Sequence, residues 1–439
     1  MRHNSPTLAT PANVHASTLS SRLILTCAAL MASACSSTVP SSRPQNIIAV
    51  RSAIADSLFL QGHLAAARSA YLLRLATNDR DTTAILRLGL LALWANDLDE
   101  ADGRLQSLLR GDSANRLVRS ALAEIRRRQG RYLEAATLYR QLGRTGMAAK
   151  LAAISSPNEV SMIGDTVRLE SAPNALLPVF QVLINGHAAY FLVDTGGGET
   201  IIDPSLADSS GVRRFGRDSA SNYAGGKSAS FEHGAVDSLR LGTAVIRNVP
   251  VQIQSTQAYS FAGAGHAVLG IIGTSLLSQF RSTLVFSEPQ MLILSARARS
   301  SPRTIAGGLT FWLLSDHLVS VEGTAMGSVP VLLVYDTGLA LPGGAFVPAP
   351  GFLGAVGGEV DGETKTGIGG GGAVSAKMFR FRRLKIGSIT RDSVVSLSGV
   401  FPPGLEYQLG THISGLVSHG FFTGRRVTLD FDTMQMIVE

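Results

Sequence analysis

The 439-residue sequence predicts a multi-domain protein in which an N-terminal α-helical solenoid is followed by two all-β lobes of similar sequence. Three observations lead to this prediction. A stretch rich in Ala, Leu and Arg repeats itself every 34 residues, which is the period of a helix pair. From about residue 160, short apolar runs alternate with polar residues and are interrupted by glycine, as is typical of strands. Within this β-rich part, several short segments recur 145 residues later.

The N-terminal segment, residues 1–35, predicts an export signal. Its stretch SRLILTCAALMASAC has a basic residue, a short apolar run and small residues before a cysteine. The final Ala-Ser-Ala-Cys resembles a bacterial lipobox, in which Cys35 becomes the lipidated first residue; the alternative is an ordinary cleaved signal. Cys27 and Cys35 are the two cysteines, and at most one of them remains after the signal is removed. We therefore expect no disulfide in the mature chain in either case. A Ser/Pro-rich linker, residues 36–45, follows.

The composition limits the class of partner. The chain is 45% hydrophobic and 16% charged, as globular proteins are, and its net charge of +7 comes mostly from scattered arginines. We therefore expect no nucleic-acid partner. No stretch after the signal approaches the roughly 18 apolar residues of a membrane helix. We expect a periplasmic protein or a lipoprotein of a bacterial cell envelope, held at the membrane only if Cys35 carries a lipid.

Residues 46–155 form the predicted helical region. The positions that recur every 34 residues are Ala55, Gly89 and Ala123; Gly62, Asn96 and Gly130; Ala67, Ala101 and Ala135; and Tyr71, Leu105 and Tyr139. Small residues at such spacing let antiparallel helices approach closely. The segment resembles three tetratricopeptide repeats, although the usual proline at the end of each unit is missing; the alternative is a generic helical bundle. We expect this region to hold a protein partner or to pack on the rest of the chain.

The β-rich part consists of two copies, residues 160–300 and 301–439. The segment LRLG at residues 239–242 recurs as LKIG at 384–387, and TLVF at 283–286 recurs as TLDF at 428–431. Two Asp-Thr-Gly triplets, beginning at Asp194 and Asp336, are 142 residues apart. A single triplet of this kind is common in turns. Two triplets, each directly after an apolar strand, are hard to attribute to turns alone.

Each copy has the same order of parts. An apolar strand ends in Asp-Thr-Gly, and a glycine-rich hairpin, a Leu-x-hydrophobic-Gly strand and a paired-hydrophobic stretch follow; that last stretch is VLGIIGTSLL in one copy and ISGLVSHGFF in the other. In this order of parts the sequence resembles the pepsin and retropepsin family of aspartic peptidases, specifically the bacterial retropepsin-like kind fused in tandem. The resemblance covers about residues 165–439. It implies two acid-protease lobes that form a bilobal pseudo-dimer with a peptide-binding cleft between them.

The chemistry of such a site needs two carboxyl groups. Hydrolysis of a peptide bond without a metal or a nucleophile requires one group to take a proton from water while another offers a proton to the carbonyl oxygen. Two carboxyls about 3 Å apart do both, because they cannot both ionise and so share one proton. The resemblance implies that Asp194 and Asp336 are this pair. The residues that it implies as support for the active-site loops are Thr195, Gly196, Thr337, Gly338, Ile272 and Gly273.

The resemblance also implies flap hairpins that close over a bound peptide. Glycine-rich stretches occur at the matching places, NYAGGKSAS in the first copy and KTGIGGGGAVS in the second. The flap candidates are Gly225, Gly226, Gly369 and Gly370. An ordinary mobile loop would need the same residues.

Three positions depart from the family pattern. The residue after each triplet is usually Ser, Thr or Ala, but here it is Gly197 in the first copy and Leu339 in the second. Ser418 stands where the second copy should have glycine. Leucine adds bulk near the predicted carboxyl pair, so the C-terminal copy is the one whose catalytic competence these departures put in doubt.

The remaining polar residues suggest no other chemistry. The nine histidines show no His-Glu-x-x-His or other close metal spacing, so we expect neither a metal nor another cofactor. We interpret His266, His412 and His419 as structural or surface residues. We interpret Glu199 and Asp203, which follow the first triplet, as residues of a solvated strand face.

The sequence therefore predicts an exported aspartic endopeptidase that acts on a peptide or protein substrate. One alternative is a catalytically impaired peptide-binding protein, in which the protease-like cleft and the helical repeats hold a partner. A further alternative is that the second lobe only supports the first, which then dimerises to form the site.

Overall fold

The computed structural model describes residues 53–112, 114–220, 229–297, 307–339, 345–357, 364–369 and 372–439. The predicted signal (1–35) with Cys35, and the predicted linker (36–45), lie outside these ranges. Within them, no helix has both the length and the apolar character needed to cross a bilayer.

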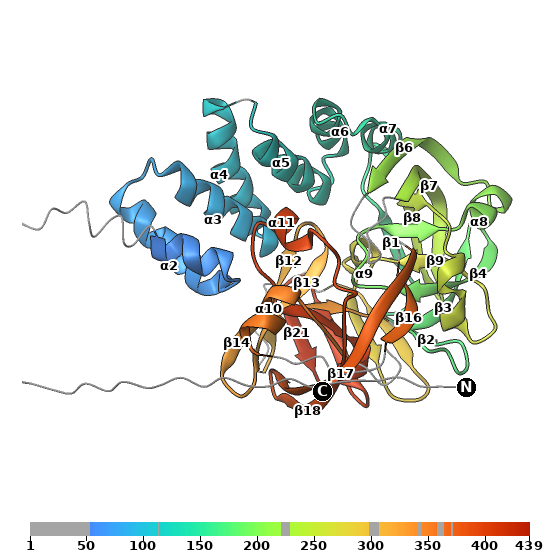
Figure 1. The fold of residues 1–439 in the computed structure, drawn as a ribbon. Coiled ribbons are helices and arrows are strands. Elements are labelled where there is room, and N and C mark those ends of the chain that lie inside the picture. Colours follow the sequence, from blue (N-terminus) through green and yellow to red (C-terminus); the bar gives the residue numbers. More distant parts are fainter. Residues whose placement is uncertain are drawn as a thin grey trace, which may run out of the picture. The chain divides into compact units, whose positions relative to one another are not determined.

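The described chain begins with a helical region, drawn in blue to teal in Figure 1. Residues 53–60 are helical, and the helices that follow are α2 (Leu64–Thr77), α3 (Thr82–Trp94), α4 (Leu98–Gly111), α5 (Arg116–Arg128), α6 (Tyr132–Gln141) and α7 (Thr145–Ile154). Each helix packs against the next in the sequence. Ala67, Ala101 and Ala135 lie in α2, α4 and α6 and are fully buried. The 34-residue period of the sequence therefore corresponds to one pair of helices.

Local sequence explains where these helices begin and how closely they approach. Asp81, Asp97 and Asn115 cap α3, α4 and α5 by accepting a hydrogen bond from a backbone N–H of the first turn. A Cβ atom at Gly89 would lie 2.7 Å from a methyl carbon of Leu105, so glycine lets α3 and α4 meet at this point.

The first β lobe contains a closed barrel. Its strands are β3 (Val179–Ile184), β4 (His187–Val193), β5 (Thr200–Ile202), β7 (Ala229–Leu241), β8 (Ala244–Ile253) and β9 (Val268–Ile272). The described strands pair in the order β3-β7-β8-β5-β9-β4, and β4 pairs with β3 to close the barrel. β4 ends in the apolar run Phe-Leu-Val, which is fully buried, as is usual for a strand covered on both faces.

The second β lobe repeats this arrangement. Its barrel strands are β13 (Leu318–Ala325), β14 (Val329–Asp336), β15 (Phe346–Pro348), β17 (Gly372–Ile386), β18 (Ile389–Ser398) and β19 (Gly415–Ser418). Among the described residues they pair in the order β13-β17-β18-β15-β19-β14, and β14 pairs with β13. Each strand has its counterpart in the first barrel at the same place in the order. The internal repeat in the sequence is therefore a repeat of the barrel.

A sheet of strands from both copies joins the two barrels. It consists of β2 (Thr166–Glu170), β10 (Arg281–Val285), β11 (Met291–Ser295), β12 (Leu309–Leu314), β20 (Arg426–Asp430) and β21 (Gln435–Val438). β10 and β20 lie antiparallel at its centre, where Thr283 is opposite Thr428. The Oγ1 atoms of these two residues are 2.7 Å apart. Because these threonines occupy equivalent places in the two copies, the chain is locally symmetric at this pair.

The helical region contacts both barrels. Phe59 and Trp94 share one buried apolar cluster with Trp312 and Leu416 of the second lobe. The last helices share another cluster with Ala235 of the first lobe. The predicted packing of the helices on the rest of the chain is thus observed, and the change from helix to strand falls between α7 and β1 (Glu159–Met162).

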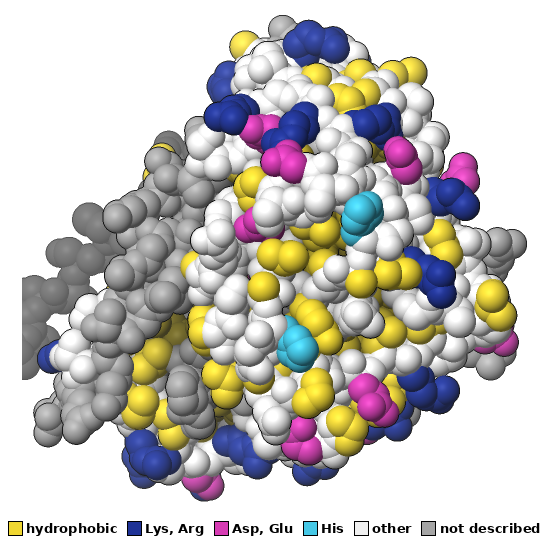
Figure 2. All heavy atoms as spheres, turned by 90° about the vertical axis from the view of Figure 1, so that its right-hand side faces the viewer, with side chains coloured by type: hydrophobic (Ala, Val, Ile, Leu, Met, Phe, Trp, Pro, Cys, Tyr) yellow, Lys and Arg dark blue, Asp and Glu magenta, His cyan; other side chains and the backbone are white. Residues whose placement is uncertain are grey.

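The surface carries charges of both signs. On the face shown in Figure 2, Lys and Arg side chains are interspersed with Asp and Glu and with hydrophobic side chains. The side chains drawn in colour on this face form no continuous basic patch.

Candidate active site

Both Asp-Thr-Gly triplets lie where an apolar strand ends. β4 ends immediately before Asp194, and β14 ends at Asp336 itself. A parallel strand runs beside each: Val193 is opposite Ile272 of β9, and Asp336 is opposite Ser418 of β19. The two triplets therefore occupy the same place in the two barrels.

The first loop is held against the end of β9. A Cβ atom at Gly273 would lie 2.6 Å from the carbonyl oxygens of both Gly198 and Glu199, so only glycine fits there. The backbone N–H of Thr274 donates a hydrogen bond to the carbonyl of Gly197 at 2.9 Å. The paired-hydrophobic segment thus fixes the backbone of the loop that carries Asp194.

The two threonines of the triplets hydrogen-bond across to the opposite loop. The backbone N–H of Thr195 donates to Oγ1 of Thr337 at 3.0 Å, and the reciprocal bond from Thr337 is 3.1 Å long. Each hydroxyl also donates to the opposite strand: Thr195 to the carbonyl of Tyr335 and Thr337 to that of Val193, both at 2.8 Å. Both threonines are fully buried. The four bonds expected between the loops are present and fix them to each other.

These contacts bring the carboxyl groups of Asp194 and Asp336 together, and the two groups share a hydrogen bond. The backbone N–H of Gly196 donates to Oδ1 of Asp194 at 2.8 Å, and that of Gly338 donates to Oδ1 of Asp336 at 3.0 Å. A Cβ atom at Gly196 would lie 2.8 Å from Cγ of Asp336, and one at Gly338 would lie 2.3 Å from Cγ of Asp194. Glycine is required in both triplets because the opposite carboxyl group occupies the space of a side chain.

The two carboxyl groups differ in their electrostatic surroundings. Burial raises the pKa of Asp194, and the hydrogen bond from Gly196 and the interaction with Asp336 oppose this shift. The positive charge of His317 opposes the rise in the pKa of Asp194 to a smaller extent. Burial and then the negative charge of Asp194 raise the pKa of Asp336 well above its usual range. Two carboxyls this close titrate as a pair, which keeps one proton over a range of pH.

His317 comes from the turn between β12 and β13. Its Nδ1 would lie 3.1 Å from a Cβ atom at Gly198, so the imidazole lies against the loop of Asp194. Burial lowers the pKa of His317, but its hydrogen-bonded neighbour Asp316 outweighs this and leaves the pKa raised. Its place beside this loop is not predictable from the sequence, because no spacing relates His317 to the triplet.

The predicted flaps coincide with hairpins in both lobes. In the first lobe the hairpin is formed by β6 (Arg213–Ala220) and β7, but Gly225 and Gly226 lie outside the described residues. In the second lobe it is formed by β16 (Thr364–Gly369) and β17, with Gly369 opposite Gly372. Gly370 also lies outside the described residues.

The departures from the family pattern have local explanations. The backbone N–H of Leu339 hydrogen-bonds to Asp336, while the Leu339 side chain packs against the apolar cluster that contains Phe59 and Trp94. Its bulk is thus accommodated by apolar packing against this cluster, which joins the second lobe to the helical region. Ser418 is fully buried, and its Oγ accepts a hydrogen bond from the backbone N–H at the start of η2 (His419–Phe422).

The interpretation of Glu199 and Asp203 as residues of a solvated face is wrong. Asp203 is buried and caps α8 (Pro204–Ser209) by accepting hydrogen bonds from Ser205. The Glu199 side chain is 10% exposed and binds Nζ of Lys150 in α7 through both oxygens, at 2.8 and 2.7 Å. One sequence signal was present: Lys150 is the single charged residue of the apolar helix TGMAAKLAAI.

The three histidines are structural or surface residues, as predicted. His266 stacks on Tyr190 with ring centroids 4.2 Å apart. His412 is largely exposed and hydrogen-bonds to Glu406. Burial lowers the pKa of His419 to about 4, so this imidazole is neutral at physiological pH. Among the described residues, no three His, Cys, Asp or Glu side chains are grouped as metal ligands would be.

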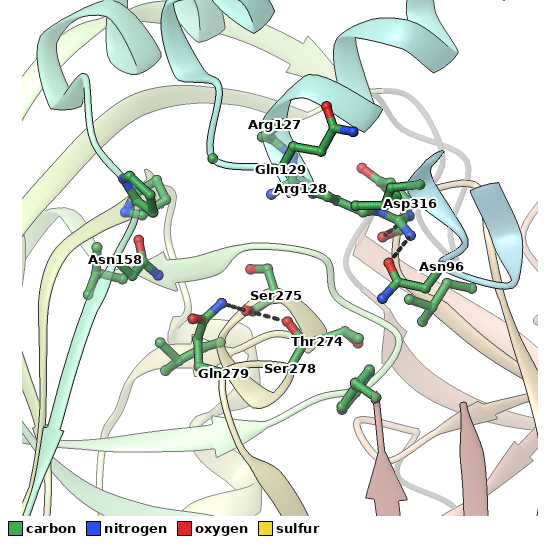
Figure 3. A pocket seen from close by; sticks show the side chains of 18 of the residues that line it. Asn96, Arg127, Arg128, Gln129, Asn158, Thr274, Ser275, Ser278, Gln279 and Asp316 are labelled. Carbon is green, nitrogen blue, oxygen red and sulfur yellow. Dashed lines mark hydrogen bonds between the residues drawn. The ribbon is translucent and has the colours of Figure 1, made fainter. Parts of the chain in front are cut away.

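A separate cavity of about 320 Å³ lies between the helical region and the lobes. Figure 3 shows Arg127, Arg128 and Gln129 on one side of it and the residues around α9 (Thr274–Leu277) on the other. Arg128 also donates a hydrogen bond to the carbonyl of Asp316 at 3.0 Å. Neither triplet contributes to the lining, so this cavity is distinct from the carboxyl pair.

Comparison with known proteins agrees with this geometry in part. Residues 180–276 match the family model described as aspartyl protease; the match includes Asp194 but not Asp336. No curated protein matches the chain. Among solved structures, the chain is similar to a retropepsin-like aspartic protease from Rickettsia conorii, with 15% identity and a TM-score of 0.20 over 32% of this chain and 93% of that one. The family match supports an aspartic protease fold around the first triplet.

Proposed function

We propose that this chain is an exported aspartic endopeptidase whose two lobes form one active site as a bilobal pseudo-dimer. The observation that carries the proposal is that, within a single chain, each carboxyl group lies directly against the glycine of the opposite triplet, where a Cβ atom would be 2.8 Å from Cγ of Asp336 or 2.3 Å from Cγ of Asp194. The alternative in which the first lobe must dimerise is not needed to bring two carboxyl groups together. Export, and lipidation at Cys35, rest on the sequence of residues 1–35.

The two carboxyl groups divide the work of hydrolysis. Asp194 accepts a proton from the attacking water. Asp336 retains its proton and donates it toward the carbonyl oxygen of the scissile bond, where negative charge develops. The threonine bonds and the N–H groups of Gly196 and Gly338 hold both carboxyls in place, so little reorganisation is needed during the reaction.

The substrate that fits this arrangement is an extended peptide. The β6–β7 and β16–β17 hairpins would close over it and hydrogen-bond to its backbone, with alternate side chains in pockets. We propose Gly225, Gly226, Gly369 and Gly370 as the flap residues. The helical region, as tetratricopeptide-like repeats, is proposed to bind a protein partner in addition to packing on the lobes.

Substitution of the carboxyl groups tests the function. Asp194→Asn and Asp336→Asn should each reduce cleavage of a mixed peptide library by about a thousandfold or more, because each removes one half of the proton relay. Circular dichroism should show the same folded state as the wild type. Asp208→Asn is the matched control, since Asp208 is an exposed carboxylate paired with Arg214. Hydrolysis that persists in both carboxyl variants would contradict the proposal.

A second candidate is a peptide-binding protein without catalysis, which Leu339 and Ser418 favour because both depart from the family pattern. Binding of a pepstatin-type inhibitor at several pH values separates the two. In a working pair, affinity falls as the pH rises through the titration of the shared proton. Peptide binding that does not change over this range, without cleavage, would support the binding protein.

A further inference from the structure

Lys150 and Glu199 form a buried ion pair between the helical region and the first catalytic loop. The Lys150 side chain has no exposed surface, and Nζ lies 2.8 and 2.7 Å from the two carboxylate oxygens of Glu199. The two residues are 49 positions apart and belong to different parts of the fold. The one charged side chain of α7 therefore contacts the loop that carries Asp194.

Glu199 lies at the end of a tightly constrained segment. The carbonyls of Gly197 and Gly198 accept hydrogen bonds from Thr274 and Ser275, each at 2.9 Å. A Cβ atom at Gly273 would also lie 2.6 Å from the carbonyl oxygen of Glu199, so the backbone of Glu199 lies directly against this glycine. Three glycines, Gly196 to Gly198, lie between Glu199 and Asp194, and the hydrogen bonds from Thr274 and Ser275 restrain two of them. These bonds connect the position of Glu199 to that of Asp194.

Helix α7 is fixed to the first flap hairpin as well. A Cβ atom at Gly146 would lie 2.6 Å from the ring of His233 in β7, so the helix and the strand are in direct contact. Phe215 of β6 and Ala235 of β7 pack in the same apolar cluster as Met147 and Leu151 of α7. Packing therefore fixes the position of Lys150 relative to the barrel. The ion pair then connects the loop of Glu199 to this fixed side chain.

The energetics of the pair argue against a purely stabilising role. Burial raises the pKa of Glu199, but Lys150 outweighs this and lowers it to about 2. Burial lowers the pKa of Lys150 despite the charge of Glu199. The pair stabilises the Glu199 carboxylate, but desolvation of the Lys150 ammonium is unfavourable. Such a pair therefore adds little or nothing to the free energy of unfolding when compared with an apolar pair of similar volume. In some proteins a buried polar or ionic group specifies how two parts meet, and this is the hypothesis for Lys150 and Glu199.

Other charged groups surround the pair without replacing either partner. Arg127 of α5 and Arg144, the N-cap residue of α7, carry positive charge toward Lys150. Arg127 and His233 act on Glu199, and His233 is itself bonded to Asp218 in β6. The phenol of Tyr132 also faces Glu199 and is neutral, since burial raises its pKa. Only Lys150 hydrogen-bonds to the Glu199 carboxylate among these groups.

We propose that Lys150 is a positioning residue for catalysis, which holds the loop of Asp194 in its working geometry through Glu199 and so makes the helical region part of the catalytic unit. This inference rests on the proposed peptidase function. It assigns the helical region a role in turnover that is separate from any partner it binds.

The test compares Lys150→Met, Glu199→Gln and the double variant Lys150→Met/Glu199→Gln in the full mature chain. With a peptide that the wild type cleaves, Lys150→Met should lower kcat at least tenfold and change KM less than threefold. The unpaired Glu199 carboxyl is then expected to have a raised pKa, so residual kcat should fall further as the pH rises through it. The double variant removes this charge without restoring the contact, so its kcat should stay at least tenfold below that of the wild type while the added pH limb disappears. Recovery of kcat to within threefold of the wild type would overturn the positioning role, because only the unpaired charge would then matter.

The matched control is Arg126→Met. Arg126 is nearly buried and binds both carboxylate oxygens of Asp102 at 2.7 and 2.8 Å, but this pair joins α5 to α4 within the helical region. Its loss should leave kcat within twofold of the wild type. An equal fall in kcat in Arg126→Met and Lys150→Met, or unchanged kcat in Lys150→Met, would overturn the inference.

Hydrogen exchange separates this inference from the proposed function. In Lys150→Met, amides of residues 194–199 should exchange at least tenfold faster than in the wild type and in Arg126→Met, whether or not the chain cleaves peptides. Faster exchange together with an inactive wild type would contradict the peptidase function while leaving the loop contact in place. Unchanged exchange would contradict the positioning role alone.

Discussion

The loops that carry the two Asp-Thr-Gly triplets make the same threonine bonds, yet different contacts hold them to the rest of the chain. The first loop meets α7 through the buried Lys150–Glu199 pair. The second places Leu339 against an apolar cluster with Phe59 and Trp94. Apolar contacts are non-directional and contribute stability, whereas a buried ion pair has one permitted geometry. The two loops therefore differ in their contacts: an ion pair constrains the first and apolar packing the second.

The asymmetry extends to the carboxyl groups. His317 lies against the first loop and opposes the rise in the pKa of Asp194, whereas the pKa of Asp336 is raised by both burial and the neighbouring carboxylate. A homodimer of identical halves would have two equivalent carboxyls in the absence of substrate. In this chain, duplication allowed the surroundings of the two acids to diverge, with His317 placed beside the first loop.

The largest effect is expected at the apolar cluster that contains Phe59. Phe59 is fully buried, stacks on Trp94 with ring centroids 5.5 Å apart, and its carbonyl accepts a hydrogen bond from Thr411 at 2.6 Å. Phe59→Ala should lower the free energy of unfolding by about 3–5 kcal/mol, because it leaves a cavity between the helices and the second lobe. Chemical denaturation measures this value. A loss below about 1 kcal/mol would mean that the contact contributes little to stability.

A smaller and symmetric effect is expected at the threonines. Thr195→Val and Thr337→Val have nearly the volume of the wild type but leave a buried N–H and a buried carbonyl without partners. Each should lower the free energy of unfolding by roughly 1–3 kcal/mol. The two values should agree within about 0.5 kcal/mol, since the bonds match in length and burial. Unequal losses, measured by denaturation side by side, would place the asymmetry inside the triplets themselves.

The parts of the site that repeat in the sequence were predictable, and those that occur once were not. The two triplets were visible as equivalent parts of two matching series of segments, because duplication repeats the same local requirement. The support roles of Thr195, Thr337, Ile272 and Gly273 were implied by the family resemblance. Lys150 and His317 could not be placed in this way. Each meets its loop through the tertiary arrangement of distant elements, and no periodicity relates a lysine in α7 to a glutamate in another domain.

The same reasoning explains the error at Glu199 and the doubt at Leu339. A glutamate that follows a glycine turn is usually solvated, and the sequence does not show that α7 covers it. A leucine beside a catalytic triplet suggests crowding, and the sequence does not show that a helix offers an apolar surface to receive it. In both cases the helical region supplies the missing partner. Its helix-pair period was visible in the sequence, but its docking surface was not.

The smallest effect is expected from the charge asymmetry of the carboxyl pair. The pKa of Asp336 is raised in the folded chain, so its acid form contributes stability below the unfolded pKa of about 4, and this contribution is lost as the pH rises through the folded value. Asp336→Asn replaces the titrating carboxyl with a neutral amide, so stability is no longer lost at this position as the pH rises. It should therefore raise the free energy of unfolding at pH 7 by on the order of 1 kcal/mol and leave it unchanged near pH 3.

Asp194→Asn is the comparison for this prediction, because the positive charge of His317 opposes the pKa rise at Asp194. It should stabilise the chain at pH 7 by less than Asp336→Asn does. Thermal melts at pH 3, 5 and 7 give both values from the same samples. If Asp194→Asn were the more stabilising change, the proton would reside on the first loop. The roles assigned to the two carboxyls would then have to be exchanged, with His317 acting on a neutral group.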